Sequence, residues 1–259
     1  FDSIIQATSG LMSVNGYADK GPLRAGLNIA DFLSGIYTTI AILAALNYRN
    51  ETGEGQFIDM SMQDVLWSLI SIEHSPEYFL SGKIPARTGN RTLVMAPSNN
   101  YPTKDGYVRI NASMYGQWCN LCKIMGRDDL IGAEKYASVK GRLEHIDEVD
   151  ALVETWTKCL TTNEIIGLCR GAHVPCTFIP EFDQVVNDPQ LISRDMIVEV
   201  EQLISGKLRV PGTPFKMSMT PGDPTQSAPF LGEHNFDIYC NLLDFGENEL
   251  RELQKDGTV

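Results

Sequence analysis

The sequence lacks the short motifs that mark the common nucleotide and hydrolase sites. It has no Gly-x-Gly-x-x-Gly, no phosphate loop ending in Gly-Lys-Ser/Thr, no Gly-x-Ser-x-Gly elbow and no His-Glu-x-x-His pair. Positive charge is also scarce, with 21 Lys and Arg against 33 Asp and Glu and a formal net charge of −12. Nucleic acids and anionic membranes bind basic surfaces, so this balance argues against either as the main partner.

Metal-ligating residues are few and poorly spaced. There are four histidines, and one Cys-x-x-Cys pair, Cys119 and Cys122, without a second pair at zinc-finger spacing. Cys169, His173 and Cys176 could in principle complete a zinc site. The spacing of Cys119 and Cys122 also fits one face of a helix, and buried structural cysteines are common. We therefore expect no metal.

The chain shows no secretion signal. No basic segment followed by an apolar stretch and a cleavage site is present, and the first residue is Phe1. Six cysteines without such a signal indicate a reducing compartment, so we expect a cytoplasmic protein.

One long apolar run, Ile29–Leu46, approaches the length of a membrane span. It carries Asp31, Ser34 and two threonines, which a span rarely tolerates. The pattern favours a helix over about residues 32–49 that is buried nearly all round in a protein core.

Asp31 is the most informative residue of that run. A carboxylate in the first turn of a helix lies where backbone N–H groups point outward and the helix dipole stabilises negative charge. An ionised, poorly hydrated carboxylate at a fixed position is a potential nucleophile. The residues alone leave a second interpretation open, in which Asp31 is only the N-cap of the helix.

The order of predicted elements is mixed α and β, without internal repeats, in a chain of 259 residues. Helices are predicted over residues 1–16, 32–49, 62–81 (with a break at Pro76), 114–126, 147–160, 162–172, 232–244 and 246–256, with one or two short ones in 182–195. Strands are predicted over residues 56–61, 107–111 and 174–179, and as a hairpin over Val198–Leu203 and Lys207–Val210. Residues 82–106 are rich in Pro, Gly and Asn and are predicted to be loop, with a domain boundary nearby.

Several stretches, taken in order, are similar to one family. They are Gln6-Ala7-Thr8-Ser9-Gly10-Leu11-Met12, Gly26-Leu27-Asn28-Ile29-Ala30-Asp31, Ala44-Ala45-Leu46, the segment from Arg49 through Thr52-Gly53-x-Gly55-Gln56 to Met62, Arg87-x-Gly89-Asn90-Arg91, Pro102-Thr103-x-Asp105-Gly106 and Leu231-Gly232-Glu233-His234. In this order and spacing the chain resembles the C-terminal two-thirds of the class III coenzyme A transferases, the group of formyl-CoA transferase and carnitine CoA-transferase.

The resemblance implies a mechanism. Asp31 is the nucleophile, which passes through a mixed anhydride to an aspartyl-CoA thioester. Backbone N–H groups near the helix start would hold the oxyanions. Phe1, Asp2 and Met62 fall at positions near the active site and the pantetheine arm, so they are expected to bind substrate or CoA. No permanent cofactor is implied, because the CoA thioester is a substrate; its partner is a carboxylic acid.

The resemblance also implies an architecture. The fold is α/β, with a partial Rossmann-like large domain and a smaller α/β domain, in dimers whose chains interlock. We expect a large-domain portion over residues 1–90, a small domain over 91–185 and a return to the large domain over 186–259. Family members carry well over a hundred residues before the position of Phe1, which implies a missing N-terminal segment or companion chain.

Two rival functions stay open. The related α-methylacyl-CoA racemases use a His and an Asp–Glu pair, and their Asp also matches Asp31. Phe1 and Met114 stand at or near the positions of the His and the Glu here. A truncated, non-catalytic chain that binds a partner is the other rival. Residues 88–101 hold a single glycine, so the shielding Gly-rich loop of formyl-CoA transferases has no counterpart and the acid pair is left open.

Overall fold

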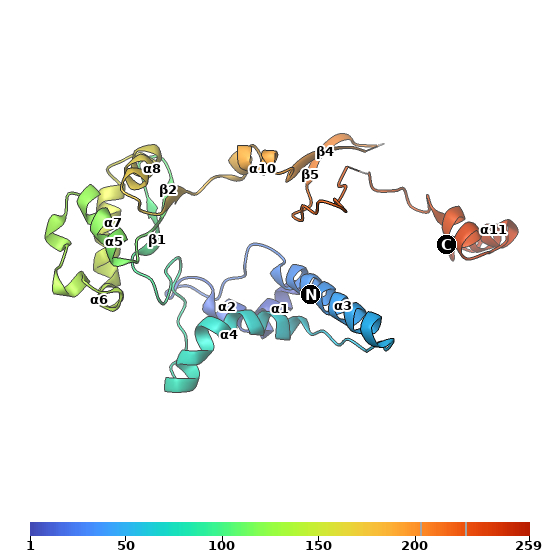
Figure 1. The fold of residues 1–259 in the computed structure, drawn as a ribbon, viewed down its shortest axis with the longest axis horizontal. Coiled ribbons are helices and arrows are strands. Elements are labelled where there is room, and N and C mark those ends of the chain that lie inside the picture. The colour runs from blue at the N-terminus through green and yellow to red at the C-terminus, as the bar shows by residue number, and fades with distance from the viewer. Residues whose placement is uncertain (203, 226) are drawn as a thin grey trace. The chain divides into compact units, whose positions relative to one another are not determined.

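The computed structural model describes residues 1–202, 204–225 and 227–259 (Figure 1). The chain forms two compact units, residues 1–179 and 180–259. The first holds a group of helices followed by a small sheet with its own helices. The division into three parts that the resemblance implies stays a prediction.

The first helical segment is shorter than expected. Instead of one helix over residues 1–16, α1 (Asp2–Thr8) and α2 (Leu11–Val14) are separated at Gly10. Gly10 has φ +90°, a left-handed conformation that glycine adopts at little cost. Helix α1 packs against both α3 and α4, so it links the two long helices.

Helix α3 (Ile29–Thr52) contains the long apolar run. It ends at Gly53, whose left-handed conformation with φ +81° is the usual helix C-cap geometry. The expectation that α3 is buried nearly all round is wrong for this chain, because only Ala30 and Ser34 are buried. Apolar side chains such as Phe32 (66% exposed) and Leu43 (61% exposed) face away from the described residues. The sequence predicts that a face is apolar, but it does not say what covers it.

By length and composition α3 also passes the test for a membrane-spanning helix, with a mean hydropathy of 1.8. Core helices of water-soluble proteins pass the same test. Asp31 and Ser34 lie in its first two turns, so we assign no span.

Helix α4 (Met62–Ser81) confirms the prediction over residues 62–81, and Ser61 caps it through Oγ. The expected break at Pro76 is wrong, since the helix continues through that residue. The expected strand at residues 56–61 is also wrong. An alternating pattern forms a strand only when a neighbouring strand completes the ladder of hydrogen bonds. Residues 56–61 have no such neighbour among the described residues.

A three-stranded antiparallel sheet follows, in the order β1-β2-β3. Strand β2 (Tyr107–Asn111) lies at its centre and β3 (Cys176–Phe178) at one edge, which confirms both predicted strands. Strand β1 (Ser98–Pro102) lies in the segment predicted as loop. Its sequence, Ser-Asn-Asn-Tyr-Pro, has low strand propensity, and pairing with β2 overrides it.

Helices pack around this sheet and enclose a buried hydrophobic core. They are α5 (Tyr115–Ile124), α6 (Val139–Glu144), α7 (Ile146–Thr157) and α8 (Thr162–Gly171), with two short 3-10 turns, η1 (Asp128–Leu130) and η2 (Glu134–Tyr136). Trp118, Leu121 and Val153 are fully buried at its centre. The predictions of α5, α7 and α8 are confirmed, and α5 carries Cys119 and Cys122 as expected.

The second unit is mostly short elements. They are α9 (Phe182–Val185), α10 (Pro189–Ser193), β4 (Ile197–Gln202), β5 (Gly206–Pro211), the wide helical turn η3 (Asp237–Leu242) and α11 (Glu247–Lys255). The antiparallel pair β4-β5 confirms the predicted hairpin, except that Leu203 lies outside the described residues.

Candidate active site at the start of the long apolar helix

Asp31 lies in the first turn of α3, three residues after the N-cap Asn28. The N-cap interpretation of Asp31 is therefore wrong, since the cap position belongs to Asn28. The Asp31 side chain is exposed and makes no hydrogen bond or ion pair within the described part of the chain. A carboxylate in this state is available to an incoming molecule.

A different carboxylate caps α3. Asp2, the first residue of α1, accepts hydrogen bonds at Oδ2 from the backbone N–H of Ala30 (2.8 Å) and of Asp31 (3.4 Å). These are orphan donors of the first helical turn, which an oxygen from elsewhere can satisfy. Residues 28 positions apart are joined in this way, and the start of α3 is anchored on α1.

The second oxygen of Asp2 is also occupied. Oδ1 accepts a 2.6 Å hydrogen bond from Gln6 and lies 3.6 Å from a guanidinium nitrogen of Arg24. Burial raises the pKa of Asp2, but the hydrogen bonds from Gln6, Ala30 and Asp31 and the charge of Arg24 together lower it below its ordinary value. Asp2 is therefore a buried, ionised carboxylate whose oxygens are taken up by the protein.

Two carboxylates thus share one helix terminus and differ in their surroundings. Asp2 is buried and fully hydrogen-bonded, whereas Asp31 is exposed. The arrangement changes one expectation. The N–H groups of Ala30 and Asp31 donate to Asp2, so they are not free to hold an oxyanion.

The other residues singled out in the sequence lie at helix starts. Phe1 is fully exposed beside Asp2. Met62 is the first residue of α4 and is half-buried. Met114, near the expected racemase glutamate, is the N-cap of α5 and is 70% exposed. The structure brings Asp2 and Asp31 together, and their roles and those of Phe1 and Met62 stay predictions.

Gln6 and Arg24 belong to this site and were not predicted as site residues. Gln6 is completely buried. The signal in the sequence is its position one helical turn after Asp2, since residues four apart share a helix face. No local pattern marks Arg24, which lies in a loop.

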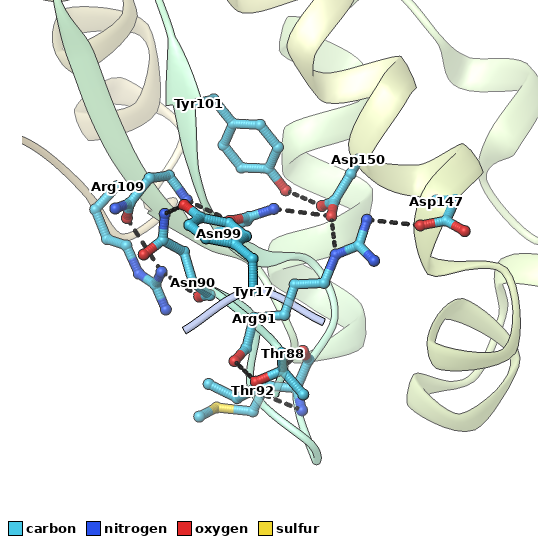
Figure 2. A network of polar contacts seen from close by, with 12 residues as sticks. Tyr17, Thr88, Asn90, Arg91, Thr92, Asn99, Tyr101, Arg109, Asp147 and Asp150 are labelled. Carbon is cyan, nitrogen blue, oxygen red and sulfur yellow. Dashed lines mark hydrogen bonds and ion pairs between the residues drawn. The ribbon is translucent and has the colours of Figure 1, made fainter. Parts of the chain in front are cut away.

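A second polar network lies in the same unit, at the edge of the small sheet (Figure 2). Asp150 on α7 accepts hydrogen bonds from Arg91 Nε (2.7 Å), Asn99 Nδ2 (2.9 Å) and Tyr101 Oη (2.6 Å). Arg91 also forms an ion pair with the exposed Asp147 at 2.8 Å. The network fixes the segment before β1 against α7.

The motif Arg87-x-Gly89-Asn90-Arg91 joins this network to the helices. Arg87 donates to the backbone oxygens of Tyr17 (3.1 Å) and Lys20 (2.6 Å), and Asn90 donates to the Tyr17 hydroxyl (3.0 Å). Gly89 has φ +64°, and a Cβ there would lie 2.5 Å from the Tyr17 ring. Only glycine fits this turn without moving the ring.

A cavity of about 610 Å³ opens beside this junction. Its lining includes Tyr17, Arg87, Asn90, Arg91 and Ile146. Its polar groups are mostly engaged with one another. We therefore describe it as part of the junction.

No group of three or more His, Cys, Asp or Glu side chains in the described ranges could hold a metal ion. Cys122 is instead buried in the core beside Trp118 and Leu121.

Comparison with known proteins places the chain. The sequence profile described as CoA-transferase family III matches residues 1–235. The chain belongs to CoA-transferase family III. This confirms the resemblance found in the sequence, over essentially the same stretch.

Three curated relatives of the family show the range of similarity. The chain is 32% identical over 255 residues to a protein named succinyl-CoA–D-citramalate CoA-transferase from Chloroflexus aurantiacus, covering 98% of this chain and 63% of the relative. It is 34% identical over 244 residues to a succinate–glutarate CoA-transferase from Agrobacterium fabrum, covering 93% and 60%. It is 31% identical over 276 residues to a formyl-CoA:oxalate CoA-transferase from Streptomyces avermitilis, covering 100% and 67%.

Solved structures agree on the fold. A CAIB/BAIF family protein from Brucella suis superposes with a TM-score of 0.78 at 30% identity, over 93% of this chain and 62% of that one. The Rv3272 protein of Mycobacterium tuberculosis gives a TM-score of 0.77 at 25% identity, over 91% and 62%. The α/β fold class is therefore confirmed. The chain spans 63% of the length of the D-citramalate CoA-transferase that it matches.

Proposed function

We propose that the complete protein transfers coenzyme A between carboxylic acids and that Asp31 is its nucleophile. One observation carries the proposal. Asp31 is an exposed carboxylate without a partner among the described residues, and it stands at a helix start that another carboxylate, Asp2, already caps. Asp31 is therefore not needed as a helix cap and is free to react.

The reaction proceeds by four acyl exchanges. An Asp31 oxygen attacks the thioester carbon of the donor. The C–S bond breaks, CoA leaves as a thiolate, and Asp31 and the donor acyl group remain joined as a mixed anhydride. The thiolate attacks the Asp31 carbonyl carbon and expels the donor carboxylate, which leaves an aspartyl-CoA thioester. The acceptor carboxylate attacks the carbonyl carbon of this thioester, which breaks the C–S bond, releases the thiolate and forms a second mixed anhydride between Asp31 and the acceptor. The thiolate then attacks the acceptor's carbonyl carbon, which forms the new acyl-CoA and restores Asp31.

A carboxylate suits this sequence better than a hydroxyl or thiol nucleophile. Its anhydride and thioester are close enough in energy for each step to run in both directions, and exclusion of water protects both from hydrolysis. We propose that Phe1 and Met62 border the acyl-CoA. Asp2 holds the start of α3 in place through its hydrogen bonds with the N–H groups of Ala30 and Asp31.

The exposed apolar face of α3 indicates that further protein packs against this helix. Side chains such as Phe32, Ile36 and Leu43 lie on the surface of the described residues, and an apolar face of this size marks a contact with further protein. We propose that this face is covered in a homodimer of the complete, cytoplasmic protein. Succinyl-CoA is the first donor to test, because two relatives above carry succinyl-CoA or succinate in their names.

The test uses the protein expressed from its complete coding sequence. It is incubated with succinyl-CoA or acetyl-CoA and digested at mildly acidic pH, and mass spectrometry then searches for CoA attached to the Asp31 peptide. We expect an adduct that disappears in Asp31→Asn. Absence of the adduct with every donor, in a folded protein, would refute the proposal.

Asp64 provides a matched control, because it is the third residue of α4 as Asp31 is the third residue of α3. Both are acidic residues in a first helical turn, so Asp64→Asn reproduces the loss of charge at a helix start. We expect Asp64→Asn to keep the adduct. A further assay follows solvent deuterium into the α carbon of an acyl-CoA. Exchange without CoA transfer would favour the racemase instead.

A further inference from the structure

Gln6 makes three hydrogen bonds from one buried side-chain amide. Its Nε2 donates to Asp2 Oδ1 at 2.6 Å and to the backbone oxygen of Leu27 at 3.1 Å. Its Oε1 accepts from the backbone N–H of Ala25 at 3.0 Å. The amide thus ties α1 to the loop that leads into α3.

We propose that Gln6 is a positioning residue for Asp31. It acts through Asp2, whose other oxygen holds the N–H groups of Ala30 and Asp31, and through the loop at Ala25 and Leu27. The inference rests on the proposed role of Asp31 as nucleophile. It adds the contacts that hold the backbone of the helical turn carrying Asp31.

The three bonds require an amide. The Asp2 oxygen and the Leu27 carbonyl both need a donor, whereas the Ala25 N–H needs an acceptor, and only a primary amide offers two donors and an acceptor on one planar group. A carboxylate would set a second negative charge against Asp2 at 2.6 Å. A hydrocarbon would remove all three bonds, and the one to Asp2 is buried.

The three hydrogen bonds of Gln6 lie where a small displacement of the backbone would move Asp31. The Asp31 side chain makes no hydrogen bond or ion pair among the described residues, so its position depends on the backbone at the start of α3. Misplacement of a reacting group by about 1 Å can reduce the rate of an enzyme about 100-fold. Loss of the Gln6 bonds is therefore expected to act on the rate of the chemical steps.

Two variants of the complete protein test this role. Gln6→Leu keeps the volume and removes all three bonds, and we expect kcat to fall about 100-fold with little change in KM for succinyl-CoA. Gln6→Glu is nearly isosteric. At pH 8 its carboxylate repels Asp2, but in the protonated form its O–H can donate to Asp2 and restore the bond. We expect its kcat relative to wild type to recover about tenfold or more between pH 8 and pH 5.5, because protonation of a carboxyl group changes up to tenfold per pH unit.

Gln254→Glu is the matched control, because Gln254 is an exposed glutamine on α11 and the chemical change is the same. We expect it to show wild-type kcat at every pH. Circular dichroism of each variant establishes that it is folded. If Gln6→Leu does not fold, Gln6→Glu still decides, because its pH dependence is measured on one protein.

The outcomes separate the two proposals. A wild-type protein without the Asp31 adduct refutes the proposed nucleophile, whatever the Gln6 variants do. An adduct in wild type, together with unchanged kcat in both Gln6 variants, refutes the positioning role alone. A fall in kcat of Gln6→Glu that is the same at all pH values also overturns it, since loss of packing would explain such a result.

Discussion

The hydroxyl group of Tyr101 on β1 donates a 2.6 Å hydrogen bond to Oδ1 of Asp150 on α7, and both residues are buried. Asp150 also accepts from Arg91 and Asn99, so one carboxylate satisfies three donors. Removing it in Asp150→Ala leaves those donors unpaired. We expect the free energy of unfolding to fall by about 3 kcal/mol, measured by urea denaturation.

Asp147 provides the comparison for that prediction. It contacts the same Arg91, but its side chain is 89% exposed. Exposed ion pairs contribute little to stability, so Asp147→Ala is expected to change the free energy of unfolding by less than about 0.5 kcal/mol. Equal effects of the two substitutions would contradict the importance of burial at Asp150.

The same tyrosine makes stability depend on alkaline pH. Burial, and then the neighbouring charge of Asp150, raises the pKa of Tyr101 far above its ordinary value. The unfolded chain loses this proton near pH 10 while the folded chain keeps it, so the stabilisation is complete below about pH 10 and is lost as the pH rises further. We expect the Tyr101→Phe protein to lose less stability between pH 9 and pH 11.5, by about 1.4 kcal/mol per pH unit above pH 10. Parallel curves for the two proteins would refute this.

Gly89 and Tyr17 allow a test of the junction. Gly89→Ala adds a Cβ 2.5 Å from Cε1 of Tyr17 and must displace the ring, which breaks the hydrogen bond from Asn90. Gly53 has a similar conformation, with φ +81°, but open space around it. We expect Gly53→Ala to cost about 1 kcal/mol from the backbone alone, and Gly89→Ala about 1 kcal/mol more. The additional cost should vanish in the double variant Tyr17→Ala, Gly89→Ala, measured as a double-mutant cycle.

Thiol chemistry distinguishes a structural cysteine from a reactive one. Cys122 is fully buried, and burial, with a further contribution from Cys119, raises its pKa to about 12. Cys159 is exposed. We expect iodoacetamide at pH 8 to modify Cys159 in the folded protein and to reach Cys122 only after unfolding in urea, as read by peptide mass spectrometry. Early modification of Cys122 would show that α5 opens in the native state.

Elements with strong local signals were predicted well from the sequence. The helices over residues 62–81 and 162–172 carry caps at Ser61 and Thr161 that act within the segment itself. Errors arose where distant residues decide the outcome. Ser98–Pro102 becomes a strand only because β2 pairs with it, and Gln56–Ser61 forms no strand because nothing pairs with it among the described residues.

The candidate site shows the same limit. Asp31 stood out because a charge in an apolar run is rare, and that pattern lies within a few residues. The cap from Asp2 joins positions 28 apart, so no local sequence pattern indicates that the helix N–H groups are occupied. Gln6 is part of a family motif and lies one helical turn after Asp2, but neither pattern shows that its side chain binds the loop before α3.

Helix α3 does not supply its own cap, and this has a consequence for when the protein can react. If α1 undocks, the N–H groups of Ala30 and Asp31 lose the Asp2 oxygen and the first turn of α3 is free to unwind. On the proposed mechanism, partly unfolded molecules would then hold Asp31 in a disordered turn. We expect such molecules not to react with acyl-CoA, so that the cap from Asp2 makes reactivity depend on correct folding.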